Sequence, residues 1–128
     1  MDPAKLRYSK THEWVHQDGD ICTVGLTQFA VEQLTDIIYI ELPDLDDPAV
    51  AGDSFGEIES VKSVNDLYSP VTGDIVEVND KLTNDPSIVS KDPYGKGWII
   101  KVKVPKGANL NHLMSFDDYQ KQISSETH

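Results

Sequence analysis

Cysteine, cations and long apolar runs are scarce in this chain of 128 residues. Cys22 is the single cysteine, so no disulfide can form within the chain, which fits a reducing compartment. No apolar stretch approaches the roughly 18 residues that a membrane-spanning helix needs. The first residues, Met1 to Arg7, lack both the apolar core of a secretory signal and the Arg- and Ser-rich pattern of a transit peptide. We therefore expect a cytoplasmic protein of bacterial type, or a mitochondrial matrix protein if the chain is eukaryotic and already mature.

The second shortage is of positive charge. The chain has 11 Lys plus Arg against 22 Asp plus Glu, which gives a formal net charge of −11. A field of that sign repels phosphate backbones and anionic lipid headgroups. The charge therefore argues against nucleic-acid and membrane partners and favours basic protein partners.

Recognisable catalytic machinery is also lacking. The histidines nearest each other, His12 and His16, flank the strand-like residues Glu13–Val15, so their rings are not expected to converge on a metal. The chain has no glycine-rich phosphate loop and no Gly-x-Ser-x-Gly motif. These absences predict a protein that is not an enzyme and holds no metal.

Alternating apolar positions dominate what is present. Three runs show this pattern: Cys22, Val24 and Leu26; Ile38, Ile40 and Leu42; and Trp98, Ile100, Val102 and Val104. Such alternation predicts half-buried antiparallel strands. The pair Asp18-Gly19 predicts a type I′ hairpin turn, because both central positions of that turn need positive φ.

Few helices are expected. Thr27 can cap a short helix that runs to Leu34, and Asp85-Pro86 is a second helix start. Ser115–Asp118 resembles a capping box for a last helix, whose apolar face would carry Phe116, Tyr119 and Ile123. The sequence thus predicts one β-rich domain over residues 1–128, with an ordered core at about 7–123 and small peripheral helices.

One lysine stands out in the middle of a probable hairpin. Lys62 lies between two β-branched runs within Ile58–Tyr68. A Schiff-base lysine needs a lowered pKa, but the neighbouring carboxylates of Glu57, Glu59 and Asp66 would favour the charged ammonium. Two interpretations remain open on the residues alone: a solvated loop lysine, which is the common case, or an acceptor lysine acylated by another enzyme.

Five short motifs narrow this choice. They are Thr11–Val15, Thr23–Thr27, Glu59–Ser63, Leu67–Gly73 and Asp92–Trp98, in that order along the chain. Together the motifs resemble the glycine cleavage system H proteins, over nearly the whole chain from Tyr8 to the last helix. The resemblance implies a lipoyl/biotinyl-type hybrid barrel-sandwich of two antiparallel sheets, with lipoate attached covalently to Lys62 on a hairpin.

The resemblance also implies a set of partners. Lipoyl-Lys62 would shuttle the aminomethyl group of glycine from the pyridoxal-phosphate-dependent glycine decarboxylase (P protein) to the tetrahydrofolate-dependent aminomethyltransferase (T protein). Dihydrolipoyl dehydrogenase (L protein) would reoxidise the carrier, and a lipoate-attaching enzyme would load it. The protein itself would catalyse nothing.

Other residues take roles by the same resemblance. Glu13 would contact the aminomethyl amine in a surface cleft, and its alternative is an ordinary solvent-facing strand residue. Glu57 and Glu59 would serve recognition by the lipoylating enzyme, and their alternative is solvated strand charge. The chain departs from the family at Phe29, where Tyr or His is usual, and at Thr35, where glycine would suit a positive φ better.

Competing functions are a biotin carrier, a lipoyl domain of a 2-oxo acid dehydrogenase, an H-like protein that relays lipoate, and an unmodified interaction module. Biotinyl lysines are typically flanked by methionines, whereas Val61 and Ser63 flank Lys62. A 2-oxo acid dehydrogenase domain would lack the first and last of the five motifs. The lipoate-relay alternative is not separated by sequence.

Overall fold

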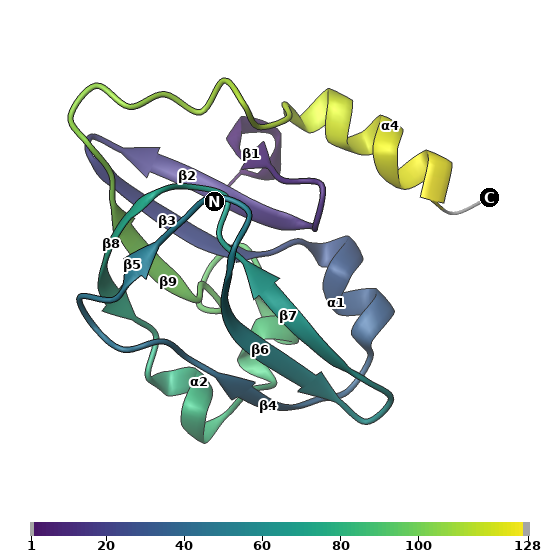
Figure 1. Ribbon diagram of the computed structural model, residues 1–128. Helices are drawn as coiled ribbons and strands as arrows, with labels where there is room; N and C mark the ends of the chain where they lie inside the picture. The colour runs from purple at the N-terminus through teal and green to yellow at the C-terminus, as the bar shows by residue number, and fades with distance from the viewer. Residues whose placement is uncertain (1, 127–128) are drawn as a thin grey trace.

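The computed structural model describes residues 2–126, which form two antiparallel sheets (Figure 1). The six-stranded sheet has, in spatial order, β1 (Arg7–Tyr8), β2 (Glu13–Asp18), β3 (Ile21–Leu26), β9 (Ile100–Lys103), β8 (Gly73–Val78) and β5 (Pro48–Ala49). The three-stranded sheet has β4 (Ile37–Glu41), β6 (Ser54–Ser60) and β7 (Val64–Tyr68). The expected mainly β fold with two antiparallel sheets is confirmed.

The helices are short and peripheral, as expected. They are η1 (Pro3–Lys5), α1 (Gln28–Leu34), α2 (Lys81–Asn84), α3 (Ile88–Lys91) and α4 (Phe116–Glu126). Thr27 caps α1 by accepting from the Ala30 amide, and the Ser115 hydroxyl accepts from the Asp118 amide at the start of α4. Asp85 and Pro86 form a turn instead of the first residues of a helix, so α3 starts slightly later than predicted.

The main core lies between the sheets. Val15 pairs with Val24, and Val24 with Ile100, so that one row of buried side chains crosses three strands. A second apolar cluster contains Leu6, which follows η1, together with Tyr8 of β1, Trp14 of β2 and Tyr119 of α4. The predicted face of Phe116 and Ile123 packs against it. The ordered core was predicted to begin at about residue 7, and the buried Leu6 lies just before that limit. The assignment of residues 1–128 to a single domain stays a prediction.

Two predicted strand faces need correction. The register of β4 against β6 shifts between Ile37 and Tyr39, so Ile37 and Ile40 are buried whereas Ile38 is 52% exposed. A β-bulge adds a residue to one strand and turns the following side chains to the opposite face. The prediction that Ile38 and Ile40 lie on one buried strand face is therefore wrong.

Trp98 also leaves its predicted face. It precedes β9 and packs against the second cluster, whereas Ile100 belongs to the main core. Ile99 between them is fully buried as well, which strict alternation excludes. The strand begins at Ile100, and the chain before it passes from one side of the sheet to the other.

The predicted hairpin between β2 and β3 is present, but its turn is of another type than predicted. Asp18 pairs with Ile21, so Gly19 and Asp20 are the two central residues. Only Gly19 has positive φ (64°), and a type I′ turn would require it at both positions. The turn therefore matches type II′, which uses glycine at its first central position.

Thr35 has the positive φ that was expected at this position, where glycine would fit better. It ends α1 with φ of 62° and ψ of −126°, a conformation that a β-branched residue adopts only under strain.

Over residues 2–126, no helix is long and apolar enough to cross a membrane.

Candidate functional site

Lys62 lies in the turn that joins β6 and β7, which projects from one end of the molecule (Figure 1). The last pair of the hairpin is Glu59 with Val64, so the lysine stands beyond the ladder. Its side chain is exposed, and within residues 2–126 its ammonium has no hydrogen bond and no ion pair. The structure thus holds the backbone at Lys62 and leaves the amine free.

The hairpin that carries Lys62 is anchored by its inner face. Ile58 of β6 and Leu67 of β7 are buried in the main core. Gly56 permits the close approach of β4, because a Cβ at this position would lie 2.3 Å from the Glu41 carbonyl oxygen. Burial and this tight contact hold the base of the hairpin in place while its turn stays in solvent.

Glu13, at the start of β2, is buried with an exposed fraction of 1%. Its carboxylate accepts hydrogen bonds from the Ser9 hydroxyl (2.6 Å), the Thr11 hydroxyl and the Tyr68 amide (3.3 Å). Burial raises its pKa to about 6, and these hydrogen bonds oppose the rise. The solvent-facing alternative for Glu13 is therefore wrong, because the side chain is enclosed and fully partnered.

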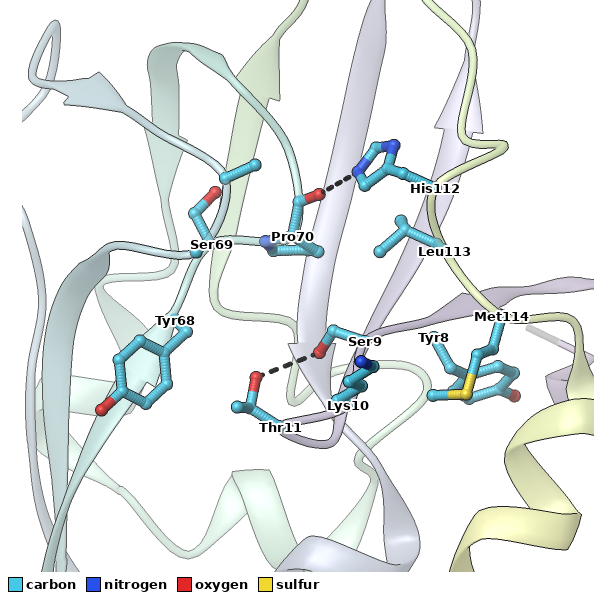
Figure 2. Close-up of a pocket in the computed structure, with 12 residues that line it drawn as sticks. Tyr8, Ser9, Lys10, Thr11, Tyr68, Ser69, Pro70, His112, Leu113 and Met114 are labelled. Carbon is cyan, nitrogen blue, oxygen red and sulfur yellow. Dashed lines mark hydrogen bonds between the residues drawn. The ribbon is translucent and has the colours of Figure 1, made fainter.

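A surface cavity of about 320 Å³ lies next to this carboxylate. All three hydrogen-bond donors to Glu13 line the cavity, together with Pro70, His112 and Met114 among others (Figure 2). Glu13 itself does not line it, so the two hydroxyls and the Tyr68 backbone separate the carboxylate from the cavity. A cation in this cavity could reach Glu13 only if the side chains of Ser9 and Thr11 moved.

Glu57 and Glu59 face solvent on the outer side of the three-stranded sheet. Glu57 stands between Glu41 of β4 and Asp66 of β7, so three carboxylates share one row across the strands. Glu59 is half-buried and stands between Tyr39 and Val64. Within residues 2–126 neither glutamate forms an ion pair.

The structure does not gather the predicted residues into one site. Glu13 contacts Tyr68 at the base of the hairpin, whereas Lys62 is at its turn. Tyr68 lies six residue steps after Lys62, which corresponds to about 20 Å along an extended chain. A group carried on Lys62 can therefore meet Glu13 only by lying back along β7.

Several contributors to the site were not predicted from the sequence. Ser9, Thr11 and Tyr68 enclose Glu13, and the spacing Ser-x-Thr-x-Glu at the start of a strand was the available indication. Ser60 was also missed, although its hydroxyl organises the turn at Lys62. Between residues 2 and 126, no group of three His, Cys, Asp or Glu side chains is placed to hold a metal ion.

Phe29, the noted departure on α1, packs its ring on His12 at a centroid distance of 5.0 Å. The other side of His12 contacts the C-terminal helix, because its Nδ1 is 2.8 Å from the Tyr119 hydroxyl. The Tyr119 hydroxyl also lies 2.7 Å from the Thr27 hydroxyl. Phe29 thus takes part in the packing that ties α1 to α4.

Comparisons with known proteins agree with this arrangement. The model of the glycine cleavage H-protein family matches residues 6–126. The glycine cleavage system H protein of Carboxydothermus hydrogenoformans is 50% identical over 124 residues, which cover 97% of this chain and 95% of that protein. The H protein of Staphylococcus epidermidis is 44% identical over 121 residues, covering 94% and 96%. The crystal structure of an H protein from Mycobacterium marinum matches with a TM-score of 0.86 at 35% identity, over 96% of this chain and 99% of that one. The chain therefore belongs to the glycine cleavage H-protein family.

Proposed function

We propose that this protein is the lipoyl carrier of the glycine cleavage system and that Lys62 is its attachment site. The observation that carries the proposal is an unpaired, exposed lysine on the turn of a hairpin whose base is buried. The amide that attaches lipoate removes the lysine charge, and within the described residues the Lys62 ammonium has no ion pair or hydrogen bond to lose.

A second lysine shows what an unsuitable position looks like. Lys101 on β9 is half-buried, lies 3.7 Å from the Glu77 carboxylate and stands over the Trp98 ring at 5.0 Å from its centroid. Acylation of Lys101 would remove both interactions. The residues around Lys62 therefore fit the prosthetic group, whereas those around Lys101 do not.

When bound, the lipoyl group would supply a dithiolane that takes up the aminomethyl cargo of glycine and is afterwards reoxidised. The chain would present this group in turn to the P, T and L proteins and, before that, its free lysine to a lipoate-attaching enzyme. Bacterial relatives favour a cytoplasmic place of action. In this proposal the partner enzymes supply the catalysis and the chain serves as the carrier.

Glu13 is the group we assign to the cationic amine of the cargo. At neutral pH a carboxyl with a pKa of about 6 is mostly ionised, and an approaching ammonium would favour the ionised form further. Ser9 and Thr11 would then have to yield one of their hydrogen bonds to the carboxylate. Because Glu13 is enclosed, an amine held there would be shielded from water.

Glu57 and Glu59 are the residues we assign to recognition by the lipoate-attaching enzyme. Both belong to the strand that leads into the Lys62 turn, and neither has a cationic partner among the described residues. A basic surface on that enzyme would supply the missing charge. The expectation is that Glu57→Gln and Glu59→Gln raise the KM for lipoylation, while Glu77→Gln, on the other sheet, leaves the KM unchanged.

The attachment site is tested by intact mass and peptide mapping after incubation of the apo-protein with lipoate, ATP and a lipoate-attaching enzyme. We expect one lipoyl increment, confined to the peptide that contains Lys62. Lys62→Arg should take up none, because arginine keeps the charge but forms no lipoyl amide, whereas Lys101→Arg should be modified like the wild type. No increment, or a biotin-sized one, would overturn the proposal.

The carrier role is tested by glycine-dependent turnover with purified P, T and L proteins. Lipoylated wild type should support turnover and Lys62→Arg should not. Full lipoylation without turnover would instead indicate the lipoate-relay alternative. The role of Glu13 is tested separately, because Glu13→Ala should retain lipoylation and shorten the lifetime of the bound aminomethyl cargo.

A further inference from the structure

The turn that presents Lys62 is organised by one buried hydroxyl. Ser60, the last residue of β6, is only 4% exposed. Its Oγ accepts hydrogen bonds from the backbone amides of Lys62 (3.3 Å) and Ser63 (3.2 Å). The Ser60 amide closes the turn by donating to the Ser63 carbonyl at 2.9 Å.

Every backbone amide between Ser60 and Ser63 has an acceptor. The Val61 amide donates to the Asp36 carbonyl at 3.1 Å, which ties the turn to the segment before β4. The Ser60 Oγ therefore accepts from two of the four amides, and no other side chain in the described residues does the same here. A serine hydroxyl that accepts from the backbone amides two and three residues ahead supplies the acceptors that a partner strand would otherwise provide.

This hydroxyl matters for Lys62 because, within the described residues, no hydrogen bond or ion pair fixes the direction of the lysine side chain. In the described residues its ammonium is unpaired, so the direction of the side chain depends on the backbone at positions 61–63. Without the Ser60 hydroxyl, the amides of Lys62 and Ser63 would turn to water and the loop would sample several conformations. An enzyme that recognises one of them would then find only a fraction of the molecules competent.

We propose that Ser60 is a positioning residue for the covalent modification of Lys62, and this inference rests on the function proposed above. Its hydroxyl holds the turn in the conformation that the lipoate-attaching enzyme recognises. Ser60 touches neither the amine nor the incoming acyl group, so it acts only through the Lys62 backbone. The enzyme forms lipoyl adenylate from lipoate and ATP and releases pyrophosphate. After the Lys62 ammonium loses one proton, the neutral amine attacks the lipoyl carbonyl, and the amide forms with loss of AMP and a second proton.

Ser63 provides the matched control within the same turn. Its hydroxyl is exposed, accepts from the Asn65 side-chain amide at 2.9 Å and lies 3.4 Å from the Ser60 Oγ. Removing it leaves both amide bonds to the Ser60 Oγ in place. If any polar side chain at this turn served recognition equally well, Ser63→Ala would be as harmful as Ser60→Ala.

The experiment measures initial rates of lipoylation of the full-length apo-protein by a purified lipoate-attaching enzyme with ATP and lipoate. We expect kcat/KM to fall about fivefold to tenfold in Ser60→Ala, from the loss of two modest hydrogen bonds. Ser60→Thr, which keeps the hydroxyl, should recover most of the rate, and Ser63→Ala should stay within about twofold of wild type. The amides of Lys62 and Ser63 should exchange faster with deuterium in Ser60→Ala only.

A reaction that needs no recognition separates positioning from simple unfolding. Acetylation of Lys62 by a small activated ester should proceed at the same rate in all four proteins, because the amine is exposed in each. Equal enzymatic kcat/KM for wild type and Ser60→Ala would overturn the inference and leave the attachment site intact. A slower chemical acetylation in Ser60→Ala would also overturn it, since the variant would then have changed the lysine itself. A wild type that takes up no lipoate at Lys62 would instead contradict the proposed function.

Discussion

Replacing Glu13 by glutamine should remove a pH-dependent penalty on folding. The carboxyl group is 1% exposed, and burial raises its pKa from the ordinary 4.5 to about 6. A change of that size corresponds to about 2 kcal/mol of differential stability between the protonated and ionised forms. The penalty exists only when Glu13 is ionised, because burial disfavours the charged form.

The sign of the pH dependence follows from the direction of this change. A group whose pKa is higher in the folded state contributes stability below its unfolded pKa, and that contribution is lost as the pH rises through the folded pKa. The free energy of unfolding of Glu13→Gln should therefore match wild type near pH 4. It should exceed wild type by up to about 2 kcal/mol above pH 7.

Glutamine can occupy the site without leaving a polar group unpaired. Its amide oxygen can accept from the Tyr68 backbone amide, as the carboxylate does at 3.3 Å. Its NH₂ group then faces the hydroxyl oxygens of Ser9 and Thr11, which can accept as well as donate. The substitution therefore isolates the charge of Glu13 from its hydrogen bonding.

The assay is urea denaturation of the apo-protein at a series of pH values, with the difference between variant and wild type plotted against pH. Glu32→Gln on α1 is the matched control, since its side chain is exposed, it lies outside the acidic row and no burial penalty is removed. A carbon-13 NMR titration of the Glu13 carboxyl gives its pKa directly. Parallel stability profiles for wild type and Glu13→Gln would refute the reasoning.

Three further substitutions test the packing that places the site. Thr35→Gly should raise the free energy of unfolding by about 1 kcal/mol in urea denaturation, because φ of 62° strains a β-branched residue and not glycine. Gly56→Ala should lower it by about 3 kcal/mol, since the new methyl group would lie 2.3 Å from the Glu41 carbonyl oxygen; an unchanged stability would show that the two strands separate easily. Tyr119→Phe should cost about 1 to 2 kcal/mol through loss of the hydroxyl that lies 2.7 Å from the Thr27 hydroxyl. The same variant should increase hydrogen exchange in α4.

The sequence was sufficient for the class of fold and for most element types. Alternation identified the core strands because β3 and β9 each have one apolar face, as Val24 and Ile100 show. It failed at Ile38, where a β-bulge shifts the register, and at Trp98, where the chain changes sides before β9 begins. Bulges and strand ends depend on pairing with a distant strand, which a local pattern does not contain.

The candidate site was predictable in the same uneven way. The position of Lys62 on a hairpin turn followed from local residues, whereas its role as the lipoyl attachment site comes from the family motifs and stays a proposal. The burial of Glu13 did not, because it depends on distant segments: Tyr68 at the end of β7 donates to its carboxylate, and Tyr119 of α4 packs in one cluster with the neighbouring Trp14. An acidic residue at a strand end is usually exposed, and only the tertiary contact with Tyr68 reverses that expectation.

Repulsion between carboxylates destabilises the outer face of the three-stranded sheet. Glu41, Glu57 and Asp66 stand directly opposite one another, an arrangement of like charges that destabilises a sheet by a few tenths of a kcal/mol per pair or more. The six-stranded sheet shows the usual solution, since Glu77 there faces Lys101 across β8 and β9. A lysine in place of any of the three carboxylates would relieve the repulsion.

Two other residues near the same hairpin also lower the stability of the fold. Thr35 holds a strained backbone just before β4, although glycine would adopt its φ freely. Glu13 keeps an ionisable carboxyl under Tyr68, although an uncharged glutamine could hydrogen-bond to the same three residues. Violations of local stability rules are expected at functional sites, and the proposed function gives the buried carboxylate and the acidic row separate roles. Under that proposal, Glu57 of the row would offer charge to a basic lipoate-attaching enzyme, and Glu13 would offer charge to a cation carried on Lys62 afterwards. Substitutions that stabilise either feature should therefore impair different steps: loading with lipoate for the row, and retention of the cargo for Glu13.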